Sequence, residues 1–260
     1  MSGGALRALW CLALALAGCS ETTVTTPLPT QAEWDSARIW LAALRAGEPK
    51  TPFGAVVRVT LREPYTRKTF EARGALAVDP HRALRMILVG PGGATAIDVW
   101  ATKEQWRFEV PAASVLRRGG SEDDPSLPIG FFRWWFLGPT DGRLLTSVAP
   151  RHSENGSAQR LVLREGGATI DLTDRRREGR HLLSASRLAA DGVDRIEFEG
   201  ASFAMGKGDH ATYDEESSGV HVEVTVEAPA DAPDPEAFTD PDVAARAARN
   251  TNGDVKASPE

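Results

Sequence analysis

Cysteine is nearly absent from this chain of 260 residues, which contains only Cys11 and Cys19. Because Cys11 lies in an apolar leader and Cys19 directly follows it, we expect no disulfide and no thiolate chemistry in the folded part. Positive charge is also scarce: 30 Lys and Arg residues stand against 36 Asp and Glu residues, for a net charge of −6. This balance argues against nucleic acid as a partner and against a polybasic attraction to anionic lipid.

Catalytic and metal-binding motifs are missing as well. The sequence has no nucleophile elbow, no zinc-protease motif and no phosphate-binding loop, and its five histidines lack metal-ligand spacing. We therefore expect no enzymatic activity, no metal and no cofactor. A lipid-modifying enzyme remains only a third alternative, because no nucleophile–base pair can be named. The run Arg175-Arg176-Arg177 fits a solvated hairpin turn, or contact with phosphate headgroups.

The N-terminus resembles a bacterial lipoprotein signal. Arg7 precedes a short apolar run that ends in Leu16-Ala17-Gly18-Cys19, a pattern typical of a cleaved signal that is too short to span a bilayer. We expect residues 1–18 to be removed and Cys19 to carry the lipid, and Ser20 after it favours the outer membrane. An ordinary secretory signal that contains a cysteine is the alternative. After residue 18 no apolar run approaches the ~20 residues of a membrane-spanning helix.

A short tether and one helix follow. Residues 19–29 read as a flexible polar tether. Thr30 and Glu33 form a predicted capping box, and apolar residues then recur at helical spacing until Gly47. The next part of the sequence is dominated by strands. Apolar and polar residues alternate over 57–61 and 70–78, and strands continue at short spacing over 82–89, 94–100 and 106–110. Further strands are predicted over 160–164, 168–172, 182–188, 195–203 and 220–226.

Short turns between consecutive strands predict a mainly β (α+β) protein, an unclosed antiparallel β-barrel with helices covering the open side. The folded domain is expected over residues 30–226. From residue 227 onward the sequence is rich in Pro, Ala and Asp, so residues 227–260 are predicted to be an acidic disordered tail, with a weak helix over 241–249.

One apolar segment interrupts the strands. Residues 127–139 are predicted to form a helix with Arg133 as its one charge and with apolar side chains on both sides, so it must be buried or meet lipid. Strand residues are expected to line the interior with it. Two interpretations stay open: an apolar cavity for acyl chains, or a filled hydrophobic core. The candidate lining and plug residues are Val57, Leu76, Leu88, Trp106, Phe131, Phe132, Trp134, Trp135 and Phe136.

The helical segment also carries a family resemblance. Leu127, Pro128, Arg133, Trp135 and Gly138 follow the pattern L-P-x-x-x-x-R-x-W-x-x-G, which resembles the helical segment of the LolB family of outer-membrane lipoprotein receptors. Two upstream segments are similar too, Arg73-Gly74-Ala75-Leu76-Ala77-Val78 and the loop Gly90-Pro91-Gly92-Gly93. Order and spacing agree over roughly residues 54–140. The resemblance implies the LolA/LolB fold, an unclosed β-barrel with helices over its open side.

The resemblance also implies a function. It suggests a lipid-anchored, periplasm-facing, monomeric protein of the outer membrane that binds acyl chains or lipidated proteins, with a LolA-like periplasmic carrier as a partner. One departure concerns the loop, where the family has a protruding apolar residue used to insert lipoproteins and this sequence has Gly92. Insertion activity is therefore in doubt. The alternative function is an envelope assembly or scaffold lipoprotein with a filled core, whose acidic tail recruits a protein partner.

Overall fold

The computed structural model describes residues 29–62, 67–90, 92–121, 124, 126–153, 156–189, 192–200, 206–216 and 218–246. Predicted features at Cys19, Pro91 and residues 247–260 lie outside them. The elements are α2 (Gln31–Gly47), β1 (Phe53–Arg62), β2 (Thr69–Asp79), β3 (Ala83–Val89), β4 (Thr95–Thr102), β5 (Trp106–Val110), η1 (Pro111–Ala113), β6 (Val115–Gly119), α3 (Ile129–Leu137), β7 (Arg143–Ser153), β8 (Gly156–Glu165), β9 (Ala168–Arg177), β10 (Arg180–Ala189), β11 (Gly192–Gly200), β12 (His210–Glu215), β13 (His221–Ala230) and η2 (Pro235–Phe238).

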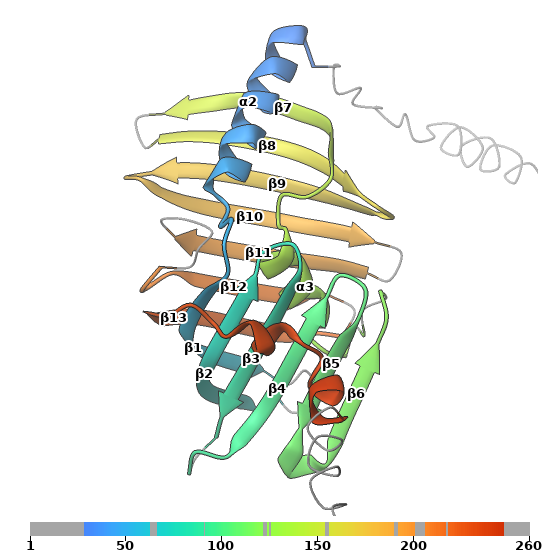
Figure 1. Ribbon diagram of the computed structural model, residues 1–260. Coiled ribbons are helices and arrows are strands. Elements are labelled where there is room, and N and C mark those ends of the chain that lie inside the picture. The colour runs from blue at the N-terminus through green and yellow to red at the C-terminus, as the bar shows by residue number, and fades with distance from the viewer. Residues whose placement is uncertain are drawn as a thin grey trace, which may run out of the picture.

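All strands of the described residues belong to one antiparallel sheet in the order β6-β5-β4-β3-β2-β1-β13-β12-β11-β10-β9-β8-β7. The strands nearest the two chain ends, β1 and β13, pair in its middle, with Val57 opposite Val226. The edge strands β6 and β7 do not pair with each other within the described residues, so the sheet is unclosed. Figure 1 shows β7–β11 running across the view and β2–β6 rising in front of them, with α3 between the two parts.

The predicted fold class is therefore confirmed, and most predicted strands are present. Strand β1 shows the expected two-residue pattern, in which Ala55, Val57 and Val59 are buried and the intervening residues are not. On the other face of the sheet, Arg58 of β1 donates hydrogen bonds to Glu227 of β13 and pairs with Glu71 of β2. These cross-strand ion pairs join three neighbouring strands where the two ends of the chain meet.

Helix α2 begins as predicted. The Thr30 hydroxyl accepts a hydrogen bond from the Glu33 backbone N–H, while the Glu33 carboxylate accepts one from the Thr30 backbone N–H. The buried side chains of α2, namely Ala37, Leu41 and Leu44, join the core, and the helix lies across strands β7–β10 (Figure 1). Among the described residues, no helix is both long and apolar enough to cross a bilayer.

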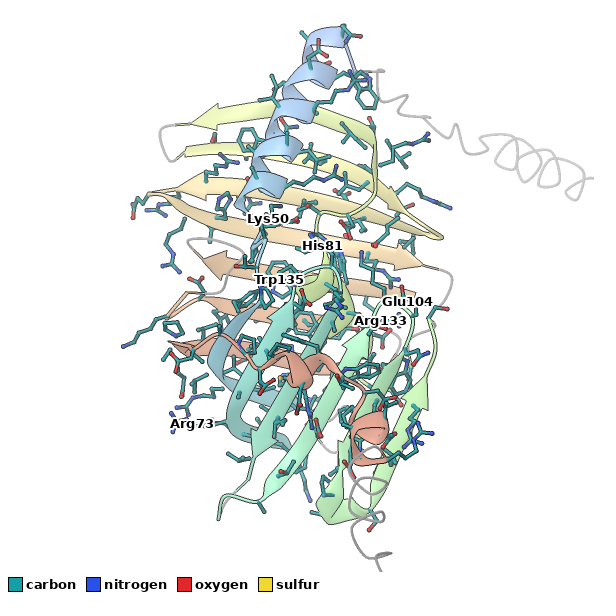
Figure 2. The ribbon with its side chains drawn as sticks, in the orientation of Figure 1. Lys50, Arg73, His81, Glu104, Arg133 and Trp135 are labelled. Carbon is teal, nitrogen blue, oxygen red and sulfur yellow. The ribbon has the colours of Figure 1, made fainter. Side chains whose placement is uncertain are left out.

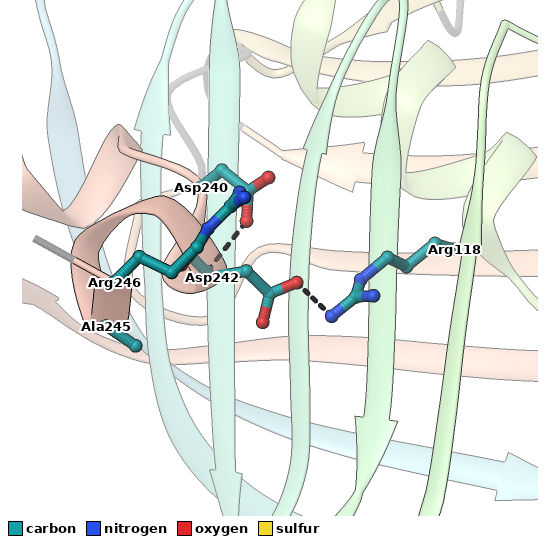
Figure 3. Close-up of a pocket in the computed structure, with 5 residues that line it drawn as sticks. All are labelled: Arg118, Asp240, Asp242, Ala245 and Arg246. Carbon is teal, nitrogen blue, oxygen red and sulfur yellow. Dashed lines mark hydrogen bonds and ion pairs between the residues drawn. The ribbon is translucent and has the colours of Figure 1, made fainter. Parts of the chain in front are cut away.

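The predicted disordered tail is wrong over residues 227–246. Strand β13 continues to Ala230, and a segment that we call the C-terminal strap, residues 231–246, then crosses β2–β4 on the side opposite α3 (Figure 1). The Trp100 indole N–H donates to the Phe238 carbonyl at 3.0 Å. Asp242 forms ion pairs with Arg107, at 3.4 Å, and with Arg118 (Figure 3). These partners lie far apart in the sequence, so composition alone did not indicate them.

Candidate functional site

The sequence-predicted lining residues converge on the inner face of the sheet. Val57 lies on β1, Leu76 on β2, Leu88 on β3 and Trp106 on β5, and each is at most 6% exposed. They belong to one hydrophobic core together with every apolar residue of α3. The structure thus brings the four strand residues and the predicted plug helix into a single cluster.

All nine residues of α3 are buried. The Phe131 ring stacks on Tyr213 of β12, with centroids 4.9 Å apart and an interplanar angle of 14°. Phe131 also packs against Phe132 and Phe136, with centroids 5.3 and 6.1 Å apart. Because α3 contacts β2, β3 and β4 on one side and β12 on the other, it fills the interior between the two parts of the sheet.

One polar side chain holds the middle of α3. Arg133 is 9% exposed, and its guanidinium donates to the backbone carbonyls of Thr102 at 2.9 Å, Ser121 at 3.1 Å and Gly120 at 3.3 Å, and to that of Lys103. Figure 2 shows Arg133 beside the β4–β5 loop, where Glu104 is labelled. The buried cation is thereby solvated by carbonyls of two loops, which fixes α3 against the β4–β6 side of the sheet.

A second polar group of residues holds the C-terminal end of α3. Arg45 of α2 donates to the carbonyls of Thr140 and Gly142, at 2.9 and 2.6 Å. The Thr140 hydroxyl donates to the buried carboxylate of Glu48. Asp141 pairs with Lys103 and lies 3.6 Å from the His81 ring. The loop that follows α3 is therefore bonded to α2 and to two turns of the sheet.

Little free space remains beside α3. A crevice of about 20 Å³ lies at its C-terminal half, lined in part by Glu48, Phe53, His81, Trp135 and Phe136. That volume holds one water molecule but no acyl chain. The Trp134 indole N–H is buried and has no hydrogen-bond partner among the described residues. Around α3, the described part of the interior is thus filled by protein side chains, and an acyl chain could take the place of α3 only if the helix moved.

The loop between β3 and β4 forms a tight turn. The Gly93 N–H donates to the Gly90 carbonyl at 3.1 Å, and the Gly90 N–H donates to Ala94 at 2.9 Å. Gly92 has a φ of +85°, is exposed, and has open space where a side chain would begin. The loop tip therefore has room for a side chain, although its backbone conformation favours glycine.

A buried carboxylate attaches α2 to the sheet. Asp174 of β9 is fully buried and accepts hydrogen bonds from the Trp40 indole of α2 at 2.8 Å and from Arg176 at 3.1 Å, and it also bonds His181 at 2.9 Å. Burial alone would raise the pKa of Asp174, but the hydrogen bonds from His181, Trp40 and Arg176 outweigh it and lower that pKa.

Sequence reasoning missed several residues that build this site. Tyr213 was missed because β12 was not predicted, although alternation of Ala211 and Tyr213 with polar residues was a usable signal. Arg45, Glu48 and Thr140 gave no signal, because their contacts join segments more than 90 residues apart. The run Arg175–Arg177 lies at the end of β9, before the hairpin turn to β10.

Comparison with known proteins finds solved structures that share this fold. No protein-family model matches the sequence. No curated protein matches it either. Among solved structures, a domain described as an outer membrane lipoprotein-sorting protein domain from Vibrio parahaemolyticus superposes with a TM-score of 0.56 at 10% identity, covering 79% of this chain and 97% of that one.

Two further solved structures also resemble this chain in fold. A LolA superfamily protein from Nitrosomonas europaea gives a TM-score of 0.50 at 11% identity, covering 78% of this chain and 97% of that one. A DUF1329 family protein from Desulfovibrio piger ATCC 29098 gives 0.54 at 11% identity, covering 84% and 99%. At these identities the likeness shows a shared fold, the unclosed antiparallel sheet with helices found in LolA superfamily proteins.

Proposed function

We propose that this protein binds acyl chains, of lipids or of lipidated proteins, inside its unclosed sheet, and that a lipid on Cys19 holds it at the periplasmic face of the outer membrane. The observation that carries the proposal is α3. A nine-residue helix that is buried on every side occupies the interior, follows the edge strand β6 and precedes the other edge strand β7. Besides its apolar packing, polar contacts hold it at Arg133 and in the loop that follows it.

The chemistry of such an exchange is favourable. If α3 moves outward, its aromatic side chains are replaced by an acyl chain, so the inner faces of β1–β5 remain covered by apolar groups and the hydrophobic contribution of these strands is retained. Directional hydrogen bonds are needed only to hold α3 in its buried position, and the Arg133 guanidinium provides such bonds. The fold shared with a lipoprotein-sorting domain and a LolA superfamily protein supports this choice of ligand.

The test is transfer of cargo. An unlipidated form that starts at residue 20 is incubated with a lipoprotein-loaded periplasmic carrier, and cargo uptake is measured alongside displacement of a fluorescent fatty acid. Trp135→Ala on α3 is compared with Leu172→Ala on β9, a core position away from the helix. We expect Trp135→Ala to change probe affinity and Leu172→Ala to leave it unchanged. Absence of uptake at micromolar protein would refute the receptor function.

The anchor has its own test. Cys19→Ala is expected to give a folded protein that no longer fractionates with outer membranes, because residues 30–246 carry their own core and the lipid contributes only attachment. If Cys19→Ala still sediments with outer membranes and resists salt extraction, lipidation at Cys19 is wrong.

One observation favours a second candidate function. Because the interior is filled and the crevice beside α3 holds about 20 Å³, the protein is alternatively an envelope scaffold lipoprotein whose barrel never opens. In that case a Trp135→Ala substitution costs the ~3–5 kcal/mol typical of a filled core and affects no ligand. Native mass spectrometry separates the two functions, since co-purified lipid contradicts the scaffold.

A further inference from the structure

The outward face of α2 carries apolar side chains beside Asp35 and Ser36 and has no protein covering it among the described residues. Ile39 is 71% exposed, more than any other large hydrophobic side chain that the structure describes as exposed. It lines an open groove of about 530 Å³ together with Ala32, Asp35, Ser36, Trp40, Ala43 and Arg176. The opposite face of the helix already supplies its packing, so the outward apolar surface is not needed to hold α2 on the sheet.

Two arginine–tryptophan pairs flank this face. The Arg176 guanidinium lies 4.7 Å from the centroid of the Trp40 ring, and that of Arg38 lies 5.9 Å from the Trp34 ring. Tryptophan and arginine each combine an apolar body with a polar end, which suits the boundary between acyl chains and headgroups. The carboxylates nearby are already engaged: Asp35 with Arg38 and Gln31, and Glu33 with the Thr30 cap.

The short distance in sequence between the proposed anchor and α2 indicates which partner covers this face of the helix. Eleven residues separate the proposed lipidation site Cys19 from the first residue of α2, Gln31. If this segment is the tether that the sequence predicts, its r.m.s. span is roughly 17–20 Å. The tether therefore keeps α2 close to the bilayer at an effective concentration of order millimolar, so that even a weak contact is populated.

We propose that the outward face of α2 docks on the phospholipid bilayer that holds the anchor, with Ile39 at the acyl boundary and Arg38 and Arg176 beside lipid phosphates. The inference rests on the anchor of the proposed function and goes beyond it, because it assigns a second membrane contact that fixes how the protein is oriented at the surface.

The test uses the lipidated full chain, purified and reconstituted into vesicles of phosphatidylethanolamine and phosphatidylglycerol. An environment-sensitive fluorophore is attached to Ile39→Cys or to Ala43→Cys, one turn farther along α2. Labelling is specific because a lipidated Cys19 leaves no other free thiol in the mature chain. The matched control is Phe70→Cys at the start of β2, where the native side chain is 56% exposed. All three positions are solvent-facing, and near-ultraviolet circular dichroism checks that each variant is folded.

We expect a blue shift of the emission at positions 39 and 43 on vesicles, and quenching there by spin-labelled phospholipid, with neither at position 70. Equal signals at all three positions overturn the inference. Shielding at position 39 without quenching by the spin-labelled lipid also overturns it, because a protein then covers the helix. Mass analysis of the Cys19 peptide separates the two proposals. An unacylated Cys19 refutes the anchor and this inference together, whereas an acylated Cys19 with a solvent-like signal at position 39 refutes this inference alone.

Discussion

Replacing Arg133 with methionine tests how α3 is held. Methionine keeps most of the length and the apolar stem of the side chain but removes the guanidinium, which donates to the carbonyls of Thr102, Lys103, Gly120 and Ser121. Those carbonyls belong to the loops after β4 and after β6. The substitution therefore separates the polar attachment of α3 from the apolar packing of its aromatic residues.

The expected change in the free energy of unfolding is the difference between two opposing contributions. A hydrogen bond to a charged group contributes ~1.5–3 kcal/mol to stability, and the Arg133 guanidinium donates such bonds to the carbonyls of Thr102, Lys103, Gly120 and Ser121. The buried guanidinium also carries a desolvation cost, which its removal recovers. We expect Arg133→Met to lower the free energy of unfolding by about 2–4 kcal/mol, a large share of the ~5–15 kcal/mol of an ordinary domain.

Urea unfolding of the unlipidated form measures this loss. Arg133→Lys is expected to recover part of it, because an ammonium group still donates up to three hydrogen bonds. Arg82→Met is the matched control, since the Arg82 side chain is 79% exposed and, within the described residues, its ion pair is with Asp79 three residues away. It should change stability by less than ~1 kcal/mol. Binding of a fluorescent fatty acid should strengthen in Arg133→Met if α3 must leave its place to admit a ligand. Unfolding at the same urea concentration as wild type would refute the anchoring role of Arg133.

Three further predictions concern single positions. Gly74→Ala should destabilise the protein by about 2 kcal/mol or more, because a Cβ there would lie 1.9 Å from the Ile87 carbonyl oxygen, whereas Gly167→Ala, with open space around it, should be nearly neutral in thermal unfolding. Gly92→Leu should increase release of bound lipoprotein into liposomes, with ~1–2 kcal/mol of backbone strain from the positive φ; an unchanged release rate in a stable variant would exclude the loop as an insertion device. For Asp174 the folded-state pKa is lowered, so its stabilisation is present above the unfolded value of ~3.9 and is lost as the pH falls through the folded one. The stability gap between wild type and Asp174→Asn should therefore shrink between pH 6 and pH 3.

The sequence indicated the fold class because inner and outer residues alternate regularly in β1, β2 and β9. The sequence did not predict the strands in which this alternation of inner and outer residues is interrupted or absent. Strand β7 carries two register shifts, between Leu144 and Thr146 and between Val148 and Arg151, which disrupt the two-residue period. Strand β6 is an edge strand that is exposed along most of its length, so it needs no apolar face.

The candidate site likewise has one part that the sequence predicted and another that it did not. The apolar composition of α3 predicted a buried helix without reference to any partner. Its polar attachments depend on carbonyl groups and on residues of α2, which only the folded chain brings together. A sequence pattern can indicate that a helix is buried, but it cannot indicate what holds the helix in place.

Pairing of β1 with β13 has a consequence for how the chain acquires its structure. Arg58 and Glu227 bond across 169 positions of sequence, so the centre of the sheet cannot form until nearly the whole chain is available for folding. Until β13 is present, β1 has one unpaired edge, which is a template for aggregation, and contacts of such long range make folding slow. A chain that ends before β13 should therefore be left with an unpaired β1 edge and should aggregate rather than fold.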